Sequence, residues 1–183
     1  MQVKNIYLII GKSGAGKTTI ADILETKYHL KQIQSYTTRP PRYDGERGHI
    51  FVTKKDFTNE MISNCVAFTT YLDNYYWATK QQVDKCAIYV IDPIGVDFFK
   101  ERYDGKKKII TFVITANNDV RIKRMRARGD SESTIASRLK YDVGAFSNFV
   151  GDYTFVNNDD SFGAIDKLVE EIVETIKKIE GKE

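Results

Sequence analysis

The residues best suited to chemistry lie first in a glycine-rich turn near the beginning of the chain. Gly11, Gly16, Lys17 and Thr18 occupy the fixed positions of the pattern G-x-x-x-x-G-K-[ST], directly after an apolar run. Glycines let successive backbone N–H groups turn inward around an anion, which then lies at the positive end of the following helix. The Lys17 ammonium can reach the β- and γ-phosphates of a nucleoside triphosphate, and the Thr18 hydroxyl can be one oxygen ligand of hydrated Mg²⁺. The pattern predicts an ATP-type triphosphate site at Gly11, Ser13, Gly14, Gly16, Lys17, Thr18 and Thr19.

A second set of chemistry-bearing residues lies in the extended segment 35–42. Pro40 and Pro41 disfavour a helix there, so the segment can hold the guanidinium groups of Arg39 and Arg42 at the same opening of a binding site. Arginine binds phosphate through two parallel hydrogen bonds. This segment therefore suits a second phosphate group.

A further group of arginines follows between residues 121 and 138. Arg124 and Arg128 are four residues apart and share one face of the expected helix, with Arg121 close to that face. Alone, such a helix is as readily a solvated basic surface. Beside a triphosphate, an arginine carried by a helical lid stabilises the charge of phosphoryl transfer and is worth about 10³ to 10⁵ in rate. The group comprises Arg121, Arg124, Arg126, Arg128 and Arg138.

The elements that position these residues alternate between strands and helices. Apolar, β-branched runs predict strands at residues 3–10, 87–92 and 109–115, and shorter strand-like segments lie at 31–35 and 153–156. Together they predict a parallel, five-stranded central sheet. Helical spacing predicts helices at residues 17–28, 117–128, 131–148 and 165–179. This order predicts a three-layer α/β fold whose ligands lie at the carboxyl ends of the strands.

Between residues 35 and 85 the sequence pattern changes to short β-strand-like segments rich in Thr and Tyr, which predicts a small mixed lobe inserted into the core. The strand that follows it ends at Asp92, an acid placed to hold a metal-bound water. We expect a single domain over residues 1–183, divided into a core (1–34 and 86–183), a lobe (35–85) and an arginine-rich helical lid (120–140).

Composition excludes several other classes of protein. The 183 residues, 42% of them apolar, suit one globular domain, and a net charge of +3 does not by itself indicate nucleic acid. Cys65 and Cys86 lack metal-ligand spacing, so reduced thiols are expected. We find neither a signal-peptide pattern nor an apolar run of membrane-spanning length, and expect a cytoplasmic protein without a membrane partner.

The order and spacing of these motifs resemble the guanylate kinase family over nearly the whole chain. The matching blocks are residues 11–18 as G-x-S-G-x-G-K-T, 35–42 as S-x-T-T-R-x-x-R, 51–52 followed by 56–57, 74–76 as Asn-Tyr-Tyr, 124–132, 138–139 and 152–159. The resemblance implies a P-loop fold in which the inserted lobe binds the acceptor nucleotide. It further implies that Lys17, Arg124, Arg128 and Arg138 surround the transferred phosphoryl group, that Ser35, Arg39, Arg42 and Tyr76 hold the acceptor phosphate, and that Asn157 or Asn158 lies near adenine.

The chain departs from the family pattern where the base should be recognised. Guanine presents N–H donors that a carboxylate matches best, and the family has an acid shortly before the Asn-Tyr-Tyr block. Residues 61–72 contain no acid; Ala67 or Thr70 occupies its place, and Asp73 is a displaced candidate. Trp77 replaces a small residue and could stack on a base or belong to the core.

Two more departures concern the acceptor site. His49 stands about where a phosphate-binding tyrosine is expected, so it joins the candidate acceptor residues together with Thr70 and Asp92. The family's first acid in the strand that ends at Asp92 is Val90 here. Asp92 and Thr18 remain the two candidate metal-site residues.

The resemblance implies a nucleoside monophosphate kinase that uses Mg²⁺ and ATP to phosphorylate GMP or dGMP, giving ADP and the diphosphate. Because the residues expected to recognise the base depart from the family pattern, another (deoxy)nucleoside monophosphate remains an alternative acceptor. A non-catalytic guanylate kinase-like protein-binding module and a nucleic-acid-binding NTPase are further alternatives. The expected partners are ATP and a nucleoside monophosphate, with no nucleic acid, and the expected state is a monomer or weak homodimer.

Overall fold

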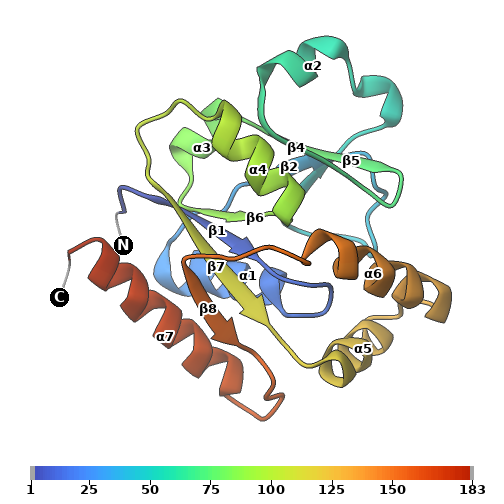
Figure 1. The fold of residues 1–183 in the computed structure, drawn as a ribbon, viewed down its shortest axis with the longest axis vertical. Helices are drawn as coiled ribbons and strands as arrows, with labels where there is room; N and C mark the ends of the chain where they lie inside the picture. Colours follow the sequence, from blue (N-terminus) through green and yellow to red (C-terminus); the bar gives the residue numbers. More distant parts are fainter. Residues whose placement is uncertain (1–2, 182–183) are drawn as a thin grey trace.

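The computed structural model describes residues 3–181 and contains two β-sheets (Figure 1). The first sheet is parallel and has the strand order β6-β1-β7-β8. Its strands are β6 (Ile88–Val90), β1 (Ile6–Ile10), β7 (Ile109–Thr115) and β8 (Tyr153–Val156). Within residues 3–181, no helix combines the length and apolar composition that crossing a bilayer needs.

The expected fifth strand of this sheet, residues 31–35, does not form. Gln32 makes an isolated parallel bridge to Ile88, and the Ile33 N–H donates to the Ile88 carbonyl. At Ser35 the chain has already entered strand β2 (Ser35–Thr37) of the other sheet. Too few residues are left beside the short β6 for a continuous ladder, so the prediction of five strands is wrong by one.

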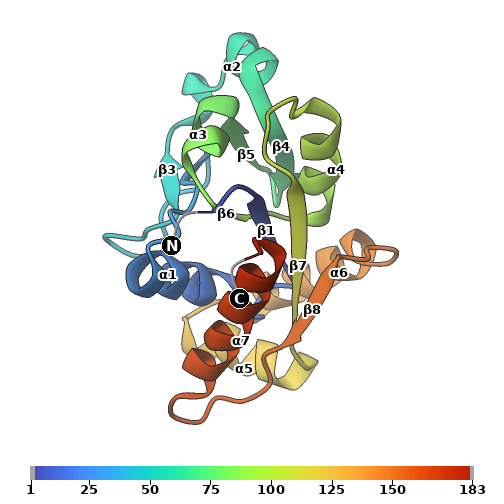
Figure 2. The same cartoon turned by 90° about the vertical axis from the view of Figure 1, so that its left-hand side faces the viewer.

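The parallel sheet is buried on both faces, as its apolar sequence predicts. All five residues of β1 are fully buried; Tyr7 and Ile9 pack in the cluster beneath α1 (Lys17–Tyr28) and α7 (Ala164–Ile179). Ile6, Leu8 and Ile10 face the opposite cluster, which includes residues of α4 (Pro93–Arg102). Figure 2 shows α1 and α7 together on one side of the sheet. This layering fixes the end of β1, and with it the glycine-rich turn.

The second sheet is mixed and has the order β3-β2-β5-β4. Its other strands are β3 (His49–Phe51), β4 (Cys65–Tyr71) and β5 (Asn74–Thr79), and short helices lie at Lys54–Asp56, α2 (Asn59–Asn64) and α3 (Lys80–Lys85). Leu72 and Asp73 form the two-residue turn between β4 and β5, and both have positive φ. Asp73 is therefore an exposed turn residue.

Helices α5 (Asn118–Ala127) and α6 (Glu132–Ala145) carry the arginine-rich segment. Gly129, with a φ of 91°, ends the first helix, and the Ser131 hydroxyl caps the second by accepting from the Thr134 N–H. The break expected at residues 129–131 is confirmed. The two helices lie beside the carboxyl end of β7 (Figure 1).

The only tryptophan of the chain is a core residue of the second sheet. Trp77 is 1% exposed, stacks on Tyr36 with ring centroids 5.3 Å apart, and contacts Phe57 at 4.8 Å. It does not line the cavity described below. Of the two alternatives left open by the sequence, the structure supports core packing.

Replacing Trp77 by alanine should destabilise the protein by about 3 to 5 kcal/mol, because a large buried side chain is lost and a cavity remains. Urea unfolding followed by circular dichroism measures the change. Tyr43→Ala is the matched control, since Tyr43 is 58% exposed and its removal should change stability by less than about 0.5 kcal/mol. A Trp77→Ala loss as small as that of the control would contradict the described packing.

Candidate active site

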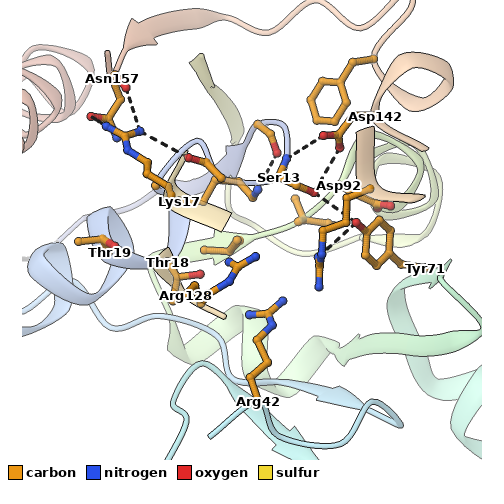
Figure 3. A pocket seen from close by; sticks show the side chains of 18 of the residues that line it. Ser13, Lys17, Thr18, Thr19, Arg42, Tyr71, Asp92, Arg128, Asp142 and Asn157 are labelled. Atoms are coloured by element: carbon orange, nitrogen blue, oxygen red, sulfur yellow. Dashed lines mark hydrogen bonds between the residues drawn. The ribbon is translucent and has the colours of Figure 1, made fainter. Parts of the chain in front are cut away.

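A cavity of about 530 Å³ brings together the glycine-rich turn, the second sheet and helices α5 and α6 (Figure 3). Most residues predicted for a site lie on its wall: Gly11, Ser13, Gly14, Gly16, Lys17, Thr18, Thr19, Ser35, Arg42, His49, Tyr76, Asp92, Arg124, Arg128, Arg138 and Asn157. Arg39 and Thr70 do not line it. Segments separated by more than 100 residues therefore meet in one cavity.

The glycine-rich turn has a backbone that other residues could not adopt. Gly16 has a φ of 94°, and a Cβ there would lie 2.4 Å from the Asn157 amide nitrogen. A Cβ on Gly11 would lie 2.3 Å from the carbonyl oxygen of Ile114 in the neighbouring strand β7. The Asn157 side-chain amide donates to the Ala15 carbonyl at 2.9 Å and so stabilises the turn. The turn is thus packed against the backbone of β7 on one side and the Asn157 side chain on the other.

Lys17 begins helix α1, and its side chain folds back over the turn. Its Nζ donates to the Gly11 carbonyl at 2.6 Å and to the Lys12 carbonyl at 3.2 Å. Desolvation lowers the pKa of Lys17 to about 8; the positive charge of Arg121 acts in the same direction, and Asp142 opposes it. An anion bound in the turn would favour the charged ammonium.

A buried ion pair holds the turn to helices α5 and α6. Arg121 of α5 and Asp142 of α6 are 2% and 3% exposed and form a salt bridge. Arg121 Nε donates to the Ser13 carbonyl at 2.8 Å, and the Ser13 N–H donates to Asp142 Oδ2 at 3.0 Å. The sequence grouped Arg121 with the arginines that face a ligand, whereas the structure uses it as a support. Asp142 was missed, although its i+4 spacing from Arg138 places both on one helix face.

Glu46 organises the arginines of segment 35–42. It accepts two hydrogen bonds from the Arg39 guanidinium, at 2.8 and 3.1 Å, and one from the Arg42 backbone N–H at 2.7 Å. Burial opposes ionisation of Glu46, but these hydrogen bonds hold its pKa below the usual value. Arg39 is therefore held by Glu46 and does not line the cavity, whereas Arg42 does.

His49, Ser35 and Tyr76 form the wall next to Arg42. His49 Nδ1 lies 3.0 Å from Ser35 Oγ, and its ring contacts that of Tyr76 with centroids 5.6 Å apart. Burial and the nearby positive charge of Arg39 lower the pKa of His49 to about 4. The imidazole is neutral at pH 7, so it can offer a hydrogen bond but no positive charge.

Three arginines of the segment 118–145 line the cavity: Arg124, Arg128 and Arg138. Arg124 bonds Asp160 at 2.9 Å and the Asn157 carbonyl at 2.9 Å. Asp130 pairs with both Arg128 and Arg138. Figure 3 shows Arg128 and Arg42 pointing into the same part of the cavity.

These cations are close enough to affect one another. Burial, together with the positive charges of Arg39, Arg128 and Arg138, lowers the pKa of Arg42. Among the described residues, Arg138 Nε is also a buried donor without a hydrogen-bond partner, although Asp130 lies 3.3 Å away. The lining holds the cationic side chains of Lys17, Arg42, Arg124, Arg128 and Arg138 together with the carboxylates of Asp92, Asp142, Asp159 and Asp160. The cations that gather here suit more than one phosphate group.

The residues expected to read a base are arranged differently from the prediction. Thr70 is exposed on the far face of β4, and its neighbour Thr69 lines the cavity instead. The Asp92 carboxylate accepts from Thr69 Oγ1, from the Tyr141 hydroxyl and from the Gly95 N–H, which it caps at the start of α4. Sequence reasoning missed Thr69 and Tyr141.

The two candidate metal residues differ in their fit to Mg²⁺. The Thr18 side chain lies on the cavity wall beside Lys17 and makes no hydrogen bond to the part of the chain that the structure describes. Asp92 already has three donors. Among the side chains that the structure describes, no cluster of three His, Cys, Asp or Glu could hold a metal. These residues fit a Mg²⁺ ion that keeps most of its water ligands and is bound mainly by nucleotide phosphates, with Thr18 as a protein ligand.

The parallel sheet, the glycine-rich turn and the arginine helices define a protein of the P-loop kinase fold class. A family model described as an AAA domain matches residues 8–144. The solved guanylate kinase from Anaplasma phagocytophilum superposes with a TM-score of 0.63 at 19% identity, covering 98% of this chain and 88% of that one.

Sequence relatives give the narrower family. A guanylate kinase from Neisseria meningitidis serogroup A is 32% identical, over 85% of this chain and 80% of the relative. One from Hydrogenovibrio crunogenus is 31% identical, over 84% and 80%. The chain thus carries an AAA domain and belongs to the guanylate kinase family.

Removing one partner of the buried pair beneath the turn should destabilise the protein by about 3 to 5 kcal/mol. Arg121→Leu leaves the Asp142 carboxylate buried and uncompensated, whereas Arg121→Leu combined with Asp142→Leu should recover part of the loss. Urea unfolding of both single variants and the double variant measures the coupling. Arg126→Leu, which removes an exposed pair with Glu132, should cost less than about 1 kcal/mol. Equal losses of unfolding free energy in the single and double variants would contradict a stabilising interaction between Arg121 and Asp142.

The depressed pKa of Lys17 predicts a pH dependence of triphosphate binding. Above pH 8 the free protein holds Lys17 mostly neutral, and bound phosphates favour the ammonium, so binding takes up a proton. The affinity should be constant well below pH 8 and fall as the pH rises through it. Calorimetry at pH 8.5 in two buffers of different ionisation enthalpy measures the uptake. Lys17→Arg, whose guanidinium stays charged, should take up no proton; wild-type binding without uptake would refute the assignment.

Proposed function

We propose that this protein is an ATP-dependent nucleoside monophosphate kinase that phosphorylates GMP or dGMP, giving ADP and GDP or dGDP. The observation that carries the proposal is the meeting of two cation sets in one cavity: Lys17 on the turn, and Arg42 on the lobe with the lid arginines. The guanylate kinase names of the relatives support the choice of guanine nucleotides. A base wall without a free carboxylate keeps another nucleoside monophosphate as the alternative acceptor.

The donor end of the cavity suits the triphosphate of ATP. Backbone N–H groups of the turn surround the phosphates at the start of α1, and the Lys17 ammonium bridges toward the phosphoryl group to be transferred. Thr18 would ligate Mg²⁺ together with phosphate oxygens and water. When bound, the ion neutralises charge on the phosphates.

The acceptor end suits the single phosphate of a monophosphate. Arg42 supplies the charge, and Ser35, His49 and Tyr76 supply hydrogen bonds. Arg39, held by Glu46, keeps this segment in place and adds positive charge behind the wall. In this arrangement an acceptor phosphate oxygen faces the γ-phosphorus of ATP.

Transfer needs no general base, because the acceptor phosphate is already an anion at neutral pH. One of its oxygens bonds to the γ-phosphorus as the bond to the β–γ bridging oxygen breaks, and ADP leaves with that electron pair. Arg124, Arg128 and Arg138 stabilise the charge on the transferred group. To do so, Arg124 and Arg128 exchange their present partners, Asp160 and Asp130, for phosphate oxygens.

A coupled assay of ADP formation with each ribo- and deoxyribonucleoside monophosphate tests the proposal. We expect GMP- and dGMP-dependent turnover that Lys17→Ala abolishes without loss of folded structure. Arg42→Ala should mainly raise the acceptor KM, whereas Arg128→Ala should mainly lower kcat. If no monophosphate is phosphorylated at millimolar concentration, the proposal fails. Tight ATP binding without turnover, together with binding of a phosphopeptide, would instead favour a protein-binding module.

A further inference from the structure

The lobe side of the cavity contains a carboxylate that holds two hydroxyl groups. Asp92 Oδ2 accepts from Thr69 Oγ1 at 3.0 Å and from the Tyr141 hydroxyl at 2.6 Å, and its Oδ1 accepts from the Gly95 N–H at 2.8 Å. Thr69, Asp92 and Tyr141 all line the cavity. Thr69 is 8% exposed and lies opposite Tyr76 in the register of β4 and β5, next to the proposed acceptor-phosphate residues.

This arrangement directs both hydroxyl groups toward Asp92 and places them within hydrogen-bond reach of each other. An ionised carboxylate can only accept hydrogen bonds, and each hydroxyl has one hydrogen to donate. Burial and the Asp92 carboxylate raise the pKa of Tyr141, so the phenol keeps its proton and remains a donor to Asp92. The lone pairs left on the two hydroxyl oxygens can then only accept from a ligand. The wall therefore offers two neighbouring acceptors.

A pair of acceptors distinguishes among the nucleobases. Guanine has two adjacent donor groups, the N1–H and the exocyclic amine. Adenine and cytosine place their amine beside an acceptor nitrogen, and uracil and thymine flank one N–H with two carbonyls. Hypoxanthine keeps the N1–H of guanine but lacks the amine. Two acceptors side by side match guanine best.

We propose that Thr69 and Tyr141 are the specificity-determining residues that accept from the guanine edge, with Asp92 as the positioning residue that orients them. The assignment rests on the proposed function. Residues 61–72 contain no acid that could accept hydrogen bonds from guanine. In this assignment a hydroxyl group of strand β4 and one of helix α6 accept these hydrogen bonds instead. Tyr71, whose ring meets that of Tyr141 edge-on with centroids 4.5 Å apart, holds the tyrosine in place.

Comparison of GMP with IMP tests this assignment, because their bases differ only in the exocyclic amine. We would measure kcat and KM for both acceptors with the wild type, Thr69→Val and Tyr141→Phe. Each variant loses one neutral hydrogen bond, so kcat/KM for GMP should fall about 3- to 10-fold, mainly through KM. The variant that removes the partner of the amine should leave IMP unchanged and so collapse the preference for GMP. The KM for ATP should not change.

Thr69→Ser and Thr70→Val are the matched controls. The first keeps the hydroxyl and should keep the wild-type kcat/KM for GMP, whereas a merely structural role of the methyl group would make Thr69→Ser the damaged variant. The second removes a hydroxyl from the exposed face of the same strand and should behave as wild type.

An active wild type whose GMP-to-IMP ratio is unchanged in both Thr69→Val and Tyr141→Phe would overturn the assignment alone. A wild type that phosphorylates no monophosphate would overturn the proposed function and the assignment with it.

Discussion

The structure depends on holding the phosphate-binding turn in a conformation that only its own sequence allows. Gly16 supplies the left-handed backbone, and Asn157 fills the space where a side chain would be. Ser13 is held on both its N–H and its carbonyl by the buried pair of Asp142 and Arg121. Because that pair belongs to α5 and α6, the shape of the turn and the position of these two helices depend on the same contacts.

The second constraint is the mutual repulsion of the cations that the fold collects. Lys17, Arg42 and Arg128 surround one space, and the depressed pKa values of Lys17 and Arg42 reflect their burial and this repulsion. Glu46 and Asp130 offset part of it by pairing with the arginines. In the proposed function a bound phosphate group replaces such pairings and relieves the repulsion, which would couple ligand binding to a rearrangement of the arginines.

Local signals predicted much of this arrangement. The phosphate-binding turn, helix 17–28, strands 109–115 and 153–156 and the helix break at Gly129 follow from glycine, apolar and capping patterns. Features set by tertiary context did not. The fifth strand is lost because the chain crosses early into the second sheet, and Thr69 replaces Thr70 because a shift of one residue turns a side chain to the opposite face. A buried arginine such as Arg121 carries no mark in the sequence that separates it from its exposed neighbours.

The proposed function requires one cavity to bind a triphosphate and an acceptor phosphate in line with each other. The most direct measurement is calorimetric binding of a bisubstrate compound that joins adenosine and guanosine through a chain of five phosphates. Because joining the two nucleotides makes the second contact intramolecular, we expect it to bind at least about 100-fold more tightly than ATP or GMP alone. Binding no tighter than that of ATP alone would mean that the two phosphate sites are not aligned, and would contradict the account.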